Sequence, residues 1–172
     1  MSALFFLLMR ALHVVSAAIW FGSAFFISML LAPTLAASGP SGGQVMSNLV
    51  RRGLPAFMAG VSGSTVLTGF WLYWRFTGGF DPVVSATRGG MAFGIGGIAG
   101  LTAMLVGLFG VGRNVKQIVD LMGRAMQVPE GAERGALLAR AEGLRRTVGV
   151  ASRIALVLIA VATVLMTVGH YI

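Results

Sequence analysis

The chain has 172 residues, of which 56% are hydrophobic and only 10% are charged. Soluble domains carry roughly 25% charged residues, and the mean hydropathy of this chain is +0.87. Composition therefore indicates an integral membrane protein with no room for a separate soluble domain. The sequence contains no cysteine, which excludes disulfides, iron–sulfur clusters and thiolate zinc sites. The formal net charge is +8. Because the basic residues flank apolar segments, we attribute this charge to membrane topology and contact with anionic membrane lipid, and not to nucleic-acid binding.

A helix that crosses a membrane needs about 20 apolar residues. Four segments meet this requirement and predict an all-α, four-helix membrane bundle formed by a single membrane domain, residues 1–172. The segments are residues 4–36, 54–74, 89–112 and 154–171. The first is longer than one crossing requires, and Pro33 is expected to kink or stop it. The N-terminal residues carry no basic n-region, so they are expected to start the first span and not to form a removed signal peptide.

The connections between these spans differ in character. Residues 38–44 (SGPSGGQ) and 77–88 are rich in turn-forming residues and are predicted to be irregular. Residues 113–150 instead show apolar residues at helical spacing among charged ones, interrupted at Pro129. This pattern predicts a helical hairpin that extends spans three and four beyond the membrane, with its tip near Pro129.

The distribution of basic residues predicts the orientation in the membrane. The side with the chain ends and the second connection carries three: Arg10, Arg75 and Arg88. The other side carries ten: Arg51, Arg52, Arg113, Lys116, Arg124, Arg134, Arg140, Arg145, Arg146 and Arg153. Since cytoplasmic loops carry the excess of Lys and Arg, the hairpin is predicted to be cytoplasmic. Both termini are then on the outer side, which is the periplasmic side of a bacterial inner membrane.

The two histidines, His13 and His170, lie near opposite ends of the chain. With four spans they reach the same side of the membrane at a similar depth, where two imidazoles would hold a b-type haem or a metal ion. Each histidine also has a methionine four residues before it, Met9 and Met166. Because imidazole and thioether ligands suit copper(I), a copper site is the alternative. A third interpretation is that His170 lies in the headgroup region without a ligand.

Arg10 and Trp20 lie on the same helical face as His13. A guanidinium binds carboxylates through two parallel hydrogen bonds, so Arg10 would pair with a haem propionate, and Trp20 would pack beside the ring. Arg75 and Arg88 are candidates for the second propionate. The alternative for these arginines is that their charged ends extend to the membrane surface.

The third span is rich in glycine, and the acidic residues all lie outside the spans. The glycines indicate close helix packing or, alternatively, a flat slot for a macrocycle. The five acids are Asp81, Asp120, Glu130, Glu133 and Glu142. With no carboxylate in a span, the sequence argues against a hydrolytic site and against a proton-coupled carrier.

Residues 12–22 (LHVVSAAIWFG) combine Leu-His with a Trp-x-Gly motif seven residues later. This segment resembles the first helix of the copper resistance D (CopD) family and of the HemJ family of protoporphyrinogen oxidases, which are four-helix membrane proteins. Phe25-Phe26, Ala32-Pro33 and Gly69-Phe70-Trp71 fit the same resemblance. The resemblance is diffuse elsewhere. It implies a four-helix membrane protein whose first-helix histidine, here His13, handles haem or copper.

Three functions follow as hypotheses. The first is an inner-membrane protein that binds haem b and acts in electron transfer or haem-linked oxidation, with His13 and His170 as axial ligands and a membrane redox partner or a homodimer as its partner. The second is a copper-handling protein that uses His13, His170, Met9 and Met166. The third is an accessory subunit of a larger membrane complex, without a cofactor of its own.

Overall fold

The computed structural model describes residues 3–172, and every regular element within that range is helical, as the sequence predicted. The π-helical turns are η1 and η2. The elements in chain order are α1 (Ala3–Phe26), η1 (Ile27–Leu31), α2 (Ala32–Ala37), α3 (Gly39–Arg51), α4 (Leu54–Phe76), α5 (Pro82–Ser85), α6 (Arg88–Leu105), η2 (Val106–Gly112), α7 (Arg113–Ala125) and α8 (Ala132–Val168). Met1 and Ser2 lie outside the described residues, and so does the part of the first span that was expected there.

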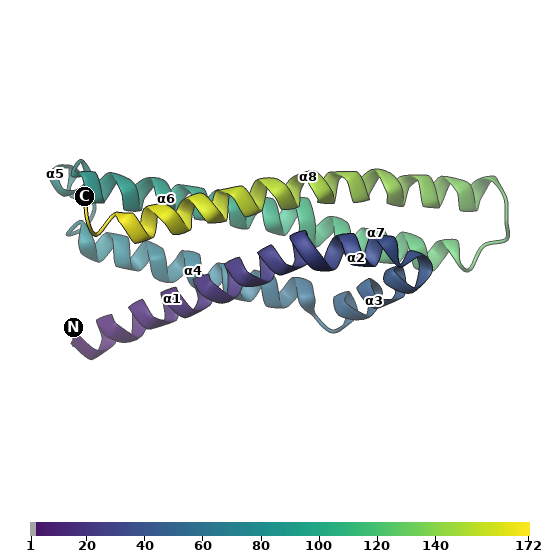
Figure 1. Ribbon diagram of the computed structural model, residues 1–172, viewed down its shortest axis with the longest axis horizontal. Coiled ribbons are helices and arrows are strands. Elements are labelled where there is room, and N and C mark those ends of the chain that lie inside the picture. Colours follow the sequence, from purple (N-terminus) through teal and green to yellow (C-terminus); the bar gives the residue numbers. More distant parts are fainter. Residues whose placement is uncertain (1–2) are drawn as a thin grey trace.

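Three helical stretches are long and apolar enough to cross a membrane: Ala3–Ala37, Arg88–Ala125 and Ala132–Val168. The helix α4 is less apolar because it carries Ser62, Ser64, Thr65 and Thr68. It packs between α1 and α6, and α6 packs in turn against α8. Figure 1 shows these helices running along the long axis of the molecule, with both chain ends at the same end.

The first apolar stretch passes Pro33 without stopping. Proline lacks the N–H that would bond the carbonyl four residues earlier, and the chain accommodates it by widening to the π-helical turn η1 just before it. The backbone N–H of Ala32 accordingly donates to the carbonyl of Ile27, five residues back. The helix then continues to Ala37.

The prediction that residues 38–44 form a turn is wrong for most of that segment. Only Ser38 and Gly39 make the bend, with Gly39 at φ +57°. Pro40 is the second residue of α3, in the first turn, where a missing N–H costs nothing. A Cβ at Gly42 would overlap the backbone of Leu35. Glycine at this position therefore allows α3 to fold back closely on α2.

The second connection is irregular apart from the single turn of α5. The side chain of Thr77 is fully buried, and its hydroxyl accepts a hydrogen bond from the backbone N–H of Phe80. Asp81 caps α5 by accepting from the N–H groups of Val83 and Val84 at 2.8 and 3.2 Å. These contacts fix the loop that carries the chain from α4 into α6.

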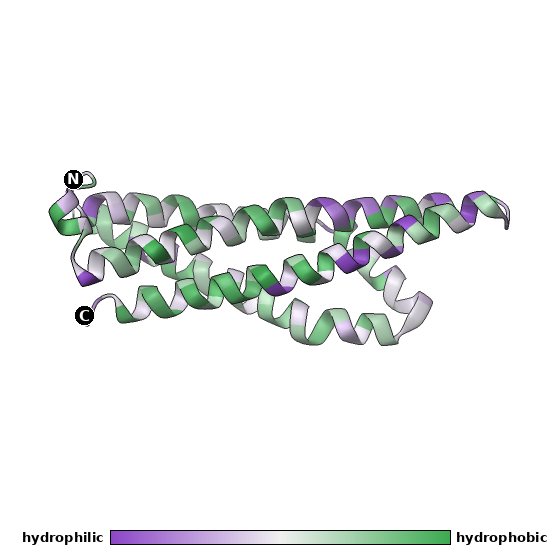
Figure 2. Ribbon diagram, turned by 90° about the horizontal axis from the view of Figure 1, so that it is seen from above, coloured by the Kyte–Doolittle hydropathy of each residue, from purple (hydrophilic) through white to green (hydrophobic). Residues whose placement is uncertain are grey.

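The helix α7 packs against the first half of α8, and the chain turns between them at residues 126–131. The predicted break near Pro129 therefore falls within this turn. From Ala132 to Val168 the chain is one uninterrupted helix, polar in its first half and apolar in its second. Figure 2 shows the hydrophilic residues of α7 and α8 gathered toward the end opposite the chain termini.

Several glycines of α6 and η2 allow close packing, which is one of the two interpretations of that glycine-rich segment. A Cβ at Gly96 would lie 3.2 Å from Met166 Cε, and one at Gly110 would lie 2.8 Å from Ala151 Cβ, both on α8. Gly97, Gly100 and Gly107 have no such neighbour within 4 Å. The apolar core joins these helices to α1, since Trp20 of α1 packs with Ala103 of α6 and Ile159 of α8.

Gly110→Ala and Gly107→Ala are a matched pair that tests this packing. Since a Cβ at position 110 meets the rigid Cβ of Ala151, we expect Gly110→Ala to lower the free energy of unfolding by about 1–3 kcal/mol. Gly107→Ala meets open space, so it should be neutral or stabilise by up to about 1 kcal/mol through helix propensity. Unfolding in detergent, followed by circular dichroism, measures both. Equal effects would contradict the packing role of Gly110.

Candidate cofactor site at His13

The imidazole of His13 is held by the backbone of α4. Its Nδ1 lies 2.9 Å from the carbonyl oxygen of Thr65 and 3.3 Å from the hydroxyl oxygen of Thr68. A carbonyl oxygen only accepts hydrogen bonds, so Nδ1 carries the proton in this contact. In the neutral ring, Nε2 then has the free lone pair.

A short row of hydroxyl groups surrounds this contact. Thr65 donates from Oγ1 to Ser16 Oγ at 3.0 Å, and Ser16 donates to the carbonyl of Leu12 at 2.6 Å. Thr68 donates to the carbonyl of Ser64 at 2.6 Å. Ser16, Thr65 and Thr68 are all buried. We call His13, Ser16, Thr65 and Thr68 the polar seam. Its hydrogen bonds join α1 to α4 within an otherwise apolar contact.

Sequence reasoning missed the α4 side of the polar seam. Its signal is the three-residue spacing of Ser62, Thr65 and Thr68, which places three hydroxyl groups close together on one side of an apolar helix. Ser62 is buried as well. Such a polar stripe indicates the face that a span turns toward a neighbouring helix, because polar groups in a bilayer need partners within the protein.

Gly69 gives the imidazole room to lie against α4. A Cβ at this position would be 2.8 Å from Cε1 of His13 and 3.2 Å from Nδ1. The ring therefore rests where any larger residue would displace it. Together with the Thr65 carbonyl, Gly69 fixes the orientation of the ring.

The second nitrogen of His13, Nε2, makes no hydrogen bond to any of the described residues, while the side chain is half-buried. The same part of the chain contains no fully buried polar side-chain atom without a partner. Nε2 is therefore not completely buried. An imidazole oriented by an Nδ1–H bond to a carbonyl, with Nε2 free, is the usual arrangement of a metal-binding histidine.

His170 lies elsewhere, in the exposed turn after α8. Its ring packs edge to face on Phe93 of α6, with centroids 5.0 Å apart, and Phe93 packs in the same way on Phe76 of α4 at 5.2 Å. His13 contacts α4 at Gly69, seven residues from Phe76. At a rise of about 1.5 Å per residue, Gly69 and Phe76 lie about 10 Å apart along α4.

The structure therefore does not bring the two imidazoles of one chain together. Two nitrogens that share one metal each lie about 2 Å from it, whereas His13 packs on α4 and His170 packs on Phe93 of α6. Figure 1 shows α1 and α8 diverging toward the end that carries both termini. One chain offers a single oriented imidazole ligand, His13, and a separate exposed one, His170.

The two methionines are not gathered around His13 either. Met166 packs against Gly96 of α6, whereas His13 packs against α4. Met9 is half-buried one turn before His13 on α1. The described residues also contain no group of three or more His, Asp or Glu side chains placed to hold a metal ion.

The remaining candidates, Arg10 and Trp20, have different surroundings. Arg10 is exposed one turn from His13 and forms no ion pair with another described residue, since the salt bridges there lie around Glu130 and Glu142. Its guanidinium is free for an anionic group of a ligand. Trp20 is only 6% exposed and belongs to the apolar core, so protein atoms already cover its ring.

No family model, curated protein or solved structure matches this chain.

Proposed function

We propose that this chain is a four-span protein of the bacterial inner membrane, with both termini outside and the α7–α8 hairpin in the cytoplasm. With 23 residues, α4 is about 35 Å long at 1.5 Å per residue, enough to cross a bilayer core of about 30 Å. Its hydroxyl groups are bonded within the protein, which is how a span carries polar residues. The excess of basic residues at the hairpin end supports the orientation.

We further propose that the protein binds a b-type haem through Nε2 of His13. The observation that carries this proposal is the hydrogen bond from Nδ1 of His13 to the Thr65 carbonyl at 2.9 Å, which fixes the tautomer and leaves Nε2 as a ligand atom. One chain would hold the haem through one imidazole, and the contacts of His13 and His170 with different helices argue against both histidines of one chain on the same iron.

The residues around His13 have distinct parts in this proposal. Gly69 and the Thr65 carbonyl orient the imidazole. Arg10 would neutralise a propionate through its guanidinium. A bound haem would supply one-electron chemistry for electron transfer or haem-linked oxidation. The resemblance of residues 12–22 to the CopD and HemJ families, in which a first-helix histidine handles haem or copper, supports the same assignment of His13.

Cofactor content tests this proposal against its alternatives. Protein purified in mild detergent from bacterial membranes is expected to contain haem at one per chain or one per two chains, with copper far below that level. Copper at one per chain without haem would favour the copper-handling function instead. If the protein is colourless and copper-free, and binds neither haem nor copper when these are added, the accessory-subunit function would be favoured instead.

A further inference from the structure

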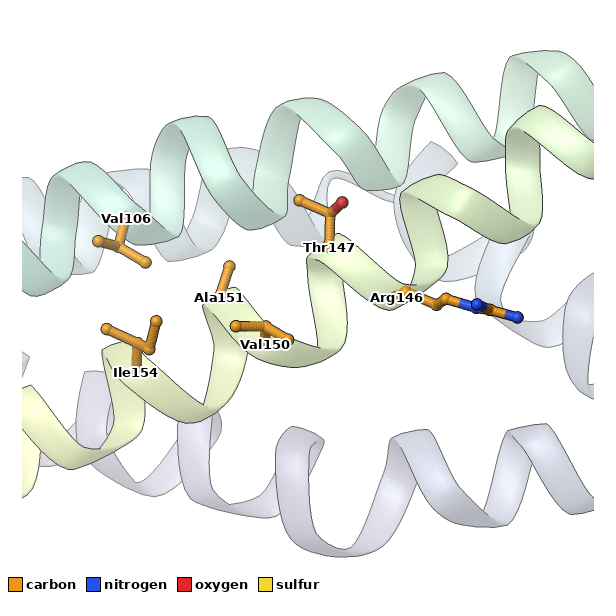
Figure 3. A pocket seen from close by; sticks show the side chains of 6 residues that line it. All are labelled: Val106, Arg146, Thr147, Val150, Ala151 and Ile154. Carbon is orange, nitrogen blue, oxygen red and sulfur yellow. The ribbon is translucent and has the colours of Figure 1, made fainter.

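An open groove of about 440 Å³ lies beside α8, away from His13. Pockets that bind small molecules usually measure roughly 300–1,000 Å³, so its size suits a ligand or part of one. Its lining is Val106 of η2 together with Arg146, Thr147, Val150, Ala151 and Ile154 of α8. Figure 3 shows Val106 and Ile154 facing each other across the groove, with the Arg146 guanidinium extending toward the opposite end. The groove is thus apolar along its length, with one cation at its end.

The groove lies where α8 changes from charged to apolar. The segment from Ala132 to Arg153 contains every charged residue of this helix, and none follows Arg153. In a membrane this change in polarity marks the boundary between headgroups and acyl chains. Ile154 would then face the acyl region, and Arg146, which is two helical turns before Arg153, would lie in the outer part of the headgroup region.

The guanidinium of Arg146 is available for an anion. Its only ion pair among the described residues is with Glu142, at the limiting distance of 4.0 Å, and its side chain is 83% exposed. An exposed pair at this distance contributes little. Glu142 also lies nearer to Arg145, at 3.6 Å. Arg146 therefore retains most of its capacity to bind a phosphate.

We propose that this groove is a binding site for an anionic phospholipid, with an acyl chain along Val106, Val150 and Ile154 and the phosphate on Arg146. The ligand's chemistry follows from the lining, since the apolar walls match a hydrocarbon chain and Arg146, the one cation in the lining, matches a phosphodiester. The site is separate from the polar seam and does not depend on a cofactor at His13.

Lipid titration of the delipidated protein in detergent, followed by native mass spectrometry, tests this site. Dioleoylphosphatidylglycerol, which is anionic, is expected to bind about fivefold more tightly than zwitterionic dioleoylphosphatidylcholine. Arg146→Gln should remove that preference. The control Arg140→Gln makes the same charge change on the same helix but outside the groove, and it should leave the preference intact. Equal loss in both variants would show general surface attraction and overturn the proposal.

A second variant tests the apolar part of the groove. Val150 is 58% exposed, so Val150→Phe fills the groove without disturbing the core, and it should weaken both lipids several-fold. Inorganic phosphate at millimolar concentration should not displace the phosphatidylglycerol, because it lacks the acyl chain. Unchanged lipid binding by Val150→Phe, or displacement by phosphate alone, would contradict an acyl chain in the groove.

Discussion

His13→Ala is expected to abolish haem retention, lowering the affinity by more than about 100-fold. Loss of residues that only orient a ligand typically costs 10–100-fold, and this change removes the ligand atom itself. The fold should persist, because interhelical hydrogen bonds in membranes contribute only about 0.6 kcal/mol on average. Co-expression with a haem supply, detergent purification and measurement of haem per chain give the result, and circular dichroism reports the fold.

The matched control for this variant is His170→Ala. His170 is exposed and packs on Phe93, away from the polar seam, so its removal should change haem retention by less than about twofold, a surface change with little energetic effect. If both variants lost the haem equally, both histidines would take part in haem binding. Their arrangement in the haem-bound protein would then differ from the one described here.

Gly69→Ala is expected to weaken haem binding by about 10–100-fold while His13 itself remains. The new Cβ would lie 2.8 Å from Cε1 of His13, so the ring must move. The movement stretches the 2.9 Å contact between Nδ1 and the Thr65 carbonyl. Because this contact orients the ring, Nε2 loses its fixed direction. Titration of the purified variant with haem measures the change in affinity.

Gly63→Ala is the control for Gly69→Ala on the same helix. A Cβ at position 63 meets nothing within 4 Å, and both substitutions gain a similar helix propensity of about 1 kcal/mol. Haem affinity should therefore be unchanged in Gly63→Ala. If Gly69→Ala bound haem as tightly as Gly63→Ala, the close fit of the imidazole against α4 would have no part in ligand binding.

Much of the fold could be predicted from local sequence signals. Long apolar segments and a helical pattern broken at Pro129 depend on neighbouring residues alone, and the structure has helices and a turn at these places. The prediction of a turn at residues 38–44 was wrong because Gly and Pro are also typical of a tightly packed helix start. Gly42 lies against the Leu35 backbone. This contact depends on tertiary packing, which turn propensities do not describe.

The candidate site was predictable only in part. His13 stands out because an ionisable residue within a span is rare. Its partners, Thr65 and Gly69, lie more than 50 residues away and were not assigned, since Ser, Thr and Gly are common in packed membrane helices. The separation of His13 from His170 depends on how α4, α6 and α8 align along their axes. Composition and span number do not determine that alignment.

Adding haem to the purified, cofactor-free protein tests whether Nε2 of His13 is a haem ligand. We expect a sharpened Soret band that saturates at one haem per one or two chains, with narrow α and β bands after dithionite reduction, and no such change in His13→Ala. A spectrum that stays that of free haem in detergent would contradict the claim, as would an identical titration by the wild-type protein and His13→Ala.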